Sequence, residues 1–177
     1  MPPPFPVCAV IELKRASPAD AIRIAETRRI VWRETYPGIY PDRMWEDYDL
    51  RTYASHDAQR ICEPGENYYV FLDECRCVGY FSFGPYHHGV YKDFPICLNH
   101  LYILKSHQGR GLGKLAFSTL QNYCKERGID KFFCGCNANN TSAMAFYRHM
   151  GGVEGDQARS DVPKMDQIVH FEFYLGD

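Results

Sequence analysis

The stretch HQGRGLGK, from His107 to Lys114, has the residue types of an anion-binding turn. Glycines stand at alternate positions, 109, 111 and 113, with the cationic side chains Arg110 and Lys114 among them. Glycine lets a backbone approach a ligand closely or adopt a positive φ. An apolar periodic segment follows, and the first N–H groups of a helix have no intrahelical partners. The turn is therefore predicted to bind an anion, most often a phosphate.

Two common phosphate-binding motifs match this turn only in part. A P-loop has Ser or Thr after its lysine to hold magnesium, whereas Leu115 follows Lys114. The dinucleotide fingerprint GxGxx[GA] is matched by residues 111–116. That kind of site also needs an acidic residue at the end of the next strand, and here residues 137–140 read NANN. A nicotinamide-dependent oxidoreductase is therefore a weaker interpretation of the turn.

The composition is ordinary for a globular protein. The 177 residues are 45% hydrophobic and carry a net charge of −2, which gives no general attraction to nucleic acid or to an anionic membrane. No apolar run could span a bilayer, so we expect a cytoplasmic protein. A flexible tail is expected over residues 1–6 and a single domain over 7–177. The eight cysteines lack CxxC spacing, and we expect them to be reduced and structural.

The elements that must position the turn alternate along the chain. Strands are expected at residues 7–13, 67–73, 77–84, 96–105, 131–136 and 167–175, from their β-branched and aromatic content. Helices are expected at 17–36, 41–48, 112–127 and 140–150, from capping residues and apolar periodicity. A hairpin early in the chain and a βαβ-like segment late in it predict a mixed sheet with helices on both sides.

A second motif lies one helix and one strand beyond the turn. Asn140 is followed by Phe146 and Tyr147, and the turn itself reads Gln108-x-x-Gly111-x-Gly113. At this separation and on these elements, the two motifs resemble the GNAT family of N-acetyltransferases over nearly the whole chain. The resemblance implies the acyl-CoA N-acyltransferase fold, of class α/β. In that fold a mixed, mostly antiparallel sheet of about six to seven strands has helices on both faces.

The resemblance also implies acetyl-CoA as cosubstrate, with no metal. The backbone of the long strand would pair with the pantetheine amides, one N–H would polarise the thioester carbonyl, and the glycine turn would hold the pyrophosphate. Asn140 would hold the pantetheine arm. The residues expected to contact acetyl-CoA are Leu101, Tyr102, Ile103, Gln108, Gly109, Arg110, Gly111, Leu112, Gly113, Lys114, Asn140 and Tyr147.

Tyr147 is the expected proton donor. A phenol is protonated at neutral pH, and the departing thiolate needs little help to leave. Family members often carry a glutamate on the long strand or on the strand before the Asn helix. The matching positions here are Cys97 and Gly135, so both carboxylates are absent.

His100 is the candidate general base, since imidazole titrates in the useful range. Strand alternation predicts that it shares a face with Leu98 and Tyr102. A structural role for His100 is an equal alternative, and a water chain or a distant acid such as Glu34 could replace it as the base.

The segment between the first two helices borders the acceptor pocket in the resembled family, which makes Glu34, Tyr36 and Tyr40 the candidates for substrate binding. The expected reaction is direct transfer, in a ternary complex, to a primary amine of a small molecule or a protein. A non-catalytic acyl-CoA binding or sensing domain is the main alternative. The pair His87 and His88 is expected in a solvated loop. Dimers are common in the family, and the resemblance leaves a homodimer open.

Overall fold

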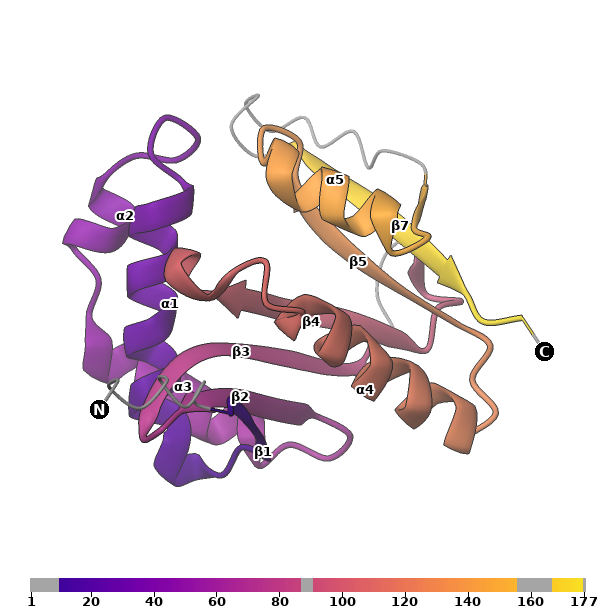
Figure 1. Ribbon diagram of the computed structural model, residues 1–177, viewed down its shortest axis with the longest axis horizontal. Coiled ribbons are helices and arrows are strands. Elements are labelled where there is room, and N and C mark those ends of the chain that lie inside the picture. Colours follow the sequence, from indigo (N-terminus) through magenta and orange to yellow (C-terminus); the bar gives the residue numbers. More distant parts are fainter. Residues whose placement is uncertain (1–9, 87–90, 156–166, 177) are drawn as a thin grey trace, which may run out of the picture.

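The computed structural model describes residues 10–86, 91–155 and 167–176. Within these ranges seven strands form one sheet in the order β1-β2-β3-β4-β5-β7-β6 (Figure 1). All neighbouring strands run antiparallel except β4 and β5. The predicted mixed, mostly antiparallel sheet is confirmed. Its strands are β1 (Glu12–Arg15), β2 (Asn67–Asp73), β3 (Arg76–Pro85), β4 (Ile96–Ile103), β5 (Lys131–Asn137), β6 (Val153–Glu154) and β7 (Ile168–Tyr174).

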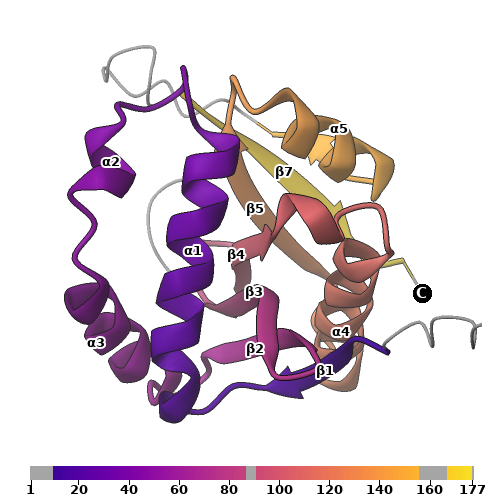
Figure 2. The ribbon, with the colours of Figure 1, turned by 60° about the vertical axis from the view of Figure 1, so that its left-hand side comes forward.

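Helices cover both faces of the sheet (Figure 2). Ile24 of α1 packs with Val70 and Tyr80 on one face, and Phe117 of α4 packs with Phe71 and Phe81 on the other. Neighbouring positions of a strand thus serve opposite faces, as the period of two requires. The helices are α1 (Ala21–Thr35), α2 (Arg43–Glu46), α3 (Leu50–Ile61), α4 (Leu112–Glu126) and α5 (Thr141–His149), with 3-10 turns at Pro18–Asp20 and Lys105–His107.

Helix α3 was not predicted, because its inward face has no apolar stripe. Its buried residue is Asp57, whose Oδ1 accepts a hydrogen bond of 2.7 Å from Nη2 of the buried Arg28 in α1. The cap at Asp49 could have revealed the helix, since its side chain accepts hydrogen bonds from the N–H groups of Arg51 and Thr52. The first strand also differs from its prediction at 7–13, because β1 runs from Glu12 to Arg15, residues 10 and 11 lie outside it, and residues 7–9 are not among those described.

Two further expectations concern the chain as a whole. None of the helices in the described ranges is long and apolar enough to cross a membrane. The described cysteines are free thiols, most of them buried. The expected tail at residues 1–6 and the pair His87 and His88 lie outside the described residues.

Candidate active site

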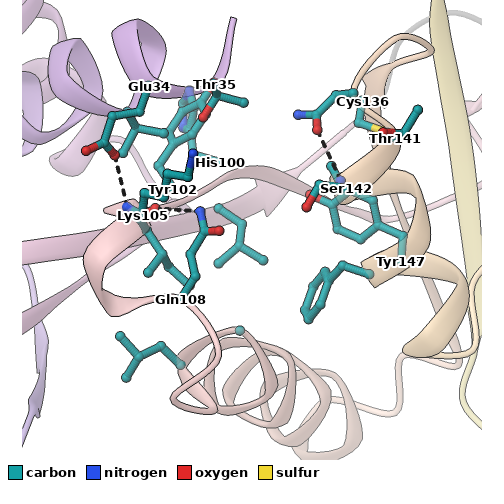
Figure 3. A pocket seen from close by; sticks show the side chains of 18 of the residues that line it. Glu34, Thr35, His100, Tyr102, Lys105, Gln108, Cys136, Thr141, Ser142 and Tyr147 are labelled. Atoms are coloured by element: carbon teal, nitrogen blue, oxygen red, sulfur yellow. Dashed lines mark hydrogen bonds between the residues drawn. The ribbon is translucent and has the colours of Figure 1, made fainter.

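A cleft lies between the two parallel strands, which separate along part of their length (Figure 1). β4 and β5 pair at only two register positions, Cys97 with Phe133 and Leu98 with Cys134. Beyond them the cleft, of about 790 Å³, is lined by both strands, the glycine turn, the end of α1 and α5. Figure 3 shows the two walls. We call the part at Lys105 and residues 108–114 the turn end, and the part lined by Asn99, His100, Tyr102, Tyr36 and Tyr147 the bulge end.

A β-bulge in β4 shapes the floor of this cleft. Leu98 pairs with Phe83 and His100 with Ser82, so Asn99 has no opposite residue on β3. A bulge reverses the alternation of side chains beyond it. Leu98 accordingly belongs to the core cluster beneath α4, whereas the His100 ring lies 5.9 Å from that of Tyr102 and 5.7 Å from that of Tyr80. The prediction that His100 shares a face with Tyr102 holds, and the same prediction for Leu98 is wrong.

The divergence of β4 and β5 also leaves one edge of β4 open. From Asn99 to Ile103 this edge lines the cleft and has no register partner on β5. An extended ligand with amide groups can pair with such an edge as an added strand. The expected backbone contacts of Leu101, Tyr102 and Ile103 therefore lie where a ligand could reach them.

The glycine turn has the backbone that the sequence predicted. Gly109 has a φ of 74° and Gly111 a φ of 83°, and Gly111 is the N-cap of α4. Gly113 serves packing instead, because a Cβ there would lie 2.8 Å from Cζ of Phe146 in α5. Gln108 braces the turn, since its Nε2 donates to the carbonyl of Ile103 at 3.1 Å.

The turn end brings the start of a helix to the cleft with a cation beside it. Gly109, Gly111, Leu112, Gly113 and Lys114 line the cleft, whereas Arg110 is exposed and does not line it. The free N–H groups of the first turn of α4 and the positive end of its dipole favour an anion there.

A second support of the turn was not predicted. His107 is buried, and its Nε2 lies 3.0 Å from Oδ2 of Asp73 at the end of β2. Its Nδ1 lies 2.8 Å from the hydroxyl of Ser106. These contacts tie the turn to the β2–β3 hairpin. The sequence separation of 34 residues between His107 and Asp73 left no local signal for them.

Tyr147 lies on the β5 wall of the cleft (Figure 3). Asn140, directly before α5, also lines the cleft. Asn140 caps α5, since its Oδ1 accepts a hydrogen bond of 3.1 Å from the N–H of Ala143. Burial, together with the nearby Cys134 and Cys136, raises the pKa of Tyr147 well above that of a free phenol. The hydroxyl of Tyr147 therefore stays protonated and can act as a hydrogen-bond or proton donor.

His100 lines the bulge end, and its Nδ1 lies 2.7 Å from the hydroxyl of the fully buried Ser82. Burial lowers the pKa of His100 to about 3, and the positive charges of Arg28 and Arg60 add to the effect. The ring is therefore neutral near pH 7. A base of such low pKa holds a proton poorly, which weighs against His100 as a simple proton store.

The three candidate substrate residues differ in position. Glu34 and Tyr36 line the cleft, and Oε2 of Glu34 accepts a hydrogen bond of 2.9 Å from the N–H of Lys105. Tyr40 does not line it. The Tyr40 hydroxyl accepts a hydrogen bond of 3.0 Å from Nδ2 of Asn137 in β5, so it links the loop after α1 to the opposite wall.

Cys97 and Gly135 stand at the two positions where the resembled family often has a glutamate. Burial raises the pKa of the Cys97 thiol to about 12, so it is a poor nucleophile. Gly135 lines the cleft, and a Cβ there would lie 2.9 Å from Cγ2 of Ile168. Neither position supplies a base.

Comparison with known proteins agrees with this geometry. The model of the acetyltransferase (GNAT) family matches residues 24–151. A mycothiol acetyltransferase from Catenulispora acidiphila is 26% identical over 151 residues, which are 76% of this chain and 45% of that protein. The chain thus spans less than half the length of this curated relative.

Solved structures share the fold. A PaiA N-acetyltransferase from Thermoplasma acidophilum, in complex with coenzyme A, has a TM-score of 0.76 and 19% identity, covering 93% of this chain and 99% of its own. YncA, a putative acetyltransferase from Salmonella typhimurium with its cofactor acetyl-CoA, has a TM-score of 0.70 and 20% identity, with 95% of each chain covered.

Proposed function

Since the chain belongs to the GNAT family of acetyltransferases, we propose that it transfers the acetyl group of acetyl-CoA directly to a primary amine. The observation that carries this proposal is the open edge of β4, which leads from the bulge to the glycine turn. One continuous site thereby offers strand pairing to an amide-containing arm and helix N–H groups to phosphates.

In this proposal the cofactor lies along the cleft from the turn end to the bulge end. The pyrophosphate would accept hydrogen bonds from the backbone at Gly109 to Lys114, with the Lys114 ammonium close by. The pantetheine amides would pair with Leu101 to Ile103, and Asn140 would border the arm. Arg110 would contribute only long-range charge, because its side chain does not line the cleft.

The chemistry proposed for the bulge end needs few charged groups. The neutral amine attacks the thioester carbon, and a backbone N–H of β4 stabilises the oxygen that becomes negative. The C–S bond then breaks and Tyr147 gives its proton to the leaving thiolate, while the proton that the amine nitrogen loses passes through water in the open cleft and restores the Tyr147 phenol. His100, held by Ser82, is the lining residue that we assign as the acceptor of a hydrogen bond from that nitrogen.

A non-catalytic acyl-CoA sensor is the second candidate. The absence of carboxylates at Cys97 and Gly135, and the low pKa of His100, favour it. The protonated phenol of Tyr147, which lines the cleft, suits a proton donor for the leaving thiolate, and for this reason we rank transfer first.

Two measurements separate these candidates. Calorimetric titration with acetyl-CoA should show micromolar binding, and titration with NADH should show none. A screen of primary amines for release of the coenzyme A thiol should then detect turnover. Binding without thiol release for any amine would favour the sensor, and binding of NADH alone would reject both. A cytoplasmic location and a homodimer stay predictions.

A further inference from the structure

Charge is distributed unevenly along the cleft. Among the described lining residues the carboxylate is Glu34, and it is bound to the backbone N–H of Lys105 at the turn end. The ammonium groups of Lys105 and Lys114 also lie at that end. The described side chains that line the bulge end are Asn99, His100, Tyr102, Tyr36 and Tyr147, and none of them is a carboxylate or an ammonium group.

The surroundings of His100 explain why a positive charge is unfavourable at the bulge end. The groups that face the ring come from four elements: Tyr68 of β2, Tyr80 and Ser82 of β3, Tyr102 of β4 and, behind Tyr80, Arg28 of α1. Arg60 of α3 adds a second positive charge that acts on the ring. Asp57 is paired with Arg28 and Glu66 with Arg60, each at 2.7 Å, so both carboxylates are held by arginines and neither is available to stabilise an ammonium ion beside the ring.

An amine that arrives as an ammonium ion would have to lose its proton before it could attack. No described side chain at the bulge end is an anion that could stabilise the ammonium ion or take its proton. We propose that the cleft accepts a weakly basic primary amine in its neutral form, of which the α-amino group is the common biological example. This inference rests on the proposed function, and it disfavours lysine side chains and polyamines as acceptors.

The expected preference for an α-amino group over an ε-amino group can be calculated from the fraction of each amine that is neutral. At a pH of about 7.5, about one third of an α-amino group of pKa about 7.8 is neutral, against about one in 800 of an ε-amino group of pKa about 10.4. If the protein binds only the neutral form, kcat/KM for total amine should differ by about 250-fold before differences in nucleophilicity. A more basic amine is the better nucleophile, so a measured ratio of about tenfold or more is the expected result.

The test uses amines of one shape and different basicity. Thiol release is measured at saturating acetyl-CoA with ethylamine and its mono- and difluorinated forms, across pH. The difluorinated amine should give the highest kcat/KM near neutral pH, and each profile should bend at the pKa of the amine itself. Equal or better turnover of ethylamine, or one bend common to the three amines, would overturn the inference.

A lysine-containing dipeptide identifies the biological class. It is offered with either its α-amino or its ε-amino group free and the other one acetylated. Faster acetylation of the free α-amine supports the inference, and faster acetylation of the ε-amine contradicts it. Thiol release from none of the amines or peptides, with acetyl-CoA bound, would instead overturn the proposed acetyl transfer itself.

A variant of Asn99 tests the electrostatic cause. Asn99 lines the cleft at the bulge, and its buried Nδ2 has no hydrogen-bond partner among the described residues. Asn99→Asp places a carboxylate of the same shape at the bulge end, and should lower the preference for the difluorinated amine over ethylamine by about tenfold or more. The uncharged control Asn99→Leu should leave that preference unchanged. An unchanged preference in folded Asn99→Asp would overturn the electrostatic argument, and the wild-type amine series decides the matter if that variant does not fold.

Discussion

The turn end and the bulge end of the cleft are built in different ways. The turn end is formed by one short stretch of chain, in which two glycines of positive φ lead into the start of α4. The bulge end is formed by contacts between distant segments, such as Ser82 with His100 and Tyr40 with Asn137. A local motif determines the backbone of the first, to which His107 and Lys105 add two ties to distant segments, whereas the packing of helices against the sheet determines the second. The two ends should therefore respond differently to substitution.

The largest expected effect is at the turn end. Gly111→Asp adds a side chain to a residue of φ 83° and a negative charge to the phosphate position. Losing two charge-assisted hydrogen bonds, at about 1.5 kcal/mol or more each, should weaken acetyl-CoA binding by about 100-fold or more. Calorimetric titration measures this directly.

The matched control lies at the other end of the same helix. Gly128 follows α4 and also has a positive φ, of 64°, and open space around its Cα. Gly128→Asp should cost a similar backbone strain and change the net charge equally, yet leave acetyl-CoA affinity unchanged. Equal affinities of the two variants would show that the turn does not hold the phosphates.

The next effect is at Tyr147. Tyr147→Phe removes the proposed proton donor and should lower kcat by about 100-fold, the lower end of what positioned proton transfer contributes. Affinity for acetyl-CoA should change little, because the ring remains in place between Phe117 and Phe171. Tyr123→Phe, on α4 and outside the cleft lining, is the control for loss of a phenol hydroxyl. Wild-type kcat in Tyr147→Phe would exclude it as the acid.

A smaller effect is expected behind the bulge end. Ser82→Ala leaves Nδ1 of the buried His100 without its partner at 2.7 Å, so the ring is free to turn away from the amine. The loss should lower kcat by about tenfold, which corresponds to about 1.4 kcal/mol, with acetyl-CoA affinity unchanged. Ser82→Thr keeps the hydroxyl and should recover most of kcat. Loss of thermal stability with unchanged kcat would make the Ser82–His100 contact purely structural.

The same contrast explains what the sequence could predict. The backbone of the glycine turn and the presence of Tyr147 in the cleft lining could be predicted because both depend on spacing along the chain, and the sheet followed from the periodicity of its strands. The bulge at Asn99 and helix α3 were missed. The pattern of apolar residues in β4 does not reveal the bulge. Helix α3 is held by the buried ion pair of Arg28 with Asp57 rather than by an apolar stripe.

The smallest expected effect tests the link across the cleft. Tyr40→Phe removes the acceptor of the 3.0 Å hydrogen bond from Nδ2 of Asn137, and with it one tie between the loop after α1 and the end of β5. The cost should be about 1 kcal/mol. Because Tyr36 in the same loop lines the cleft, KM for the amine should rise by about two- to fivefold, a change of about 1 kcal/mol or less. Affinity for acetyl-CoA should stay at the wild-type value, since the glycine turn is held by Gln108 and His107 and not by Tyr40. A matching loss of acetyl-CoA affinity would mean that the two ends of the cleft are coupled, contrary to their separate construction.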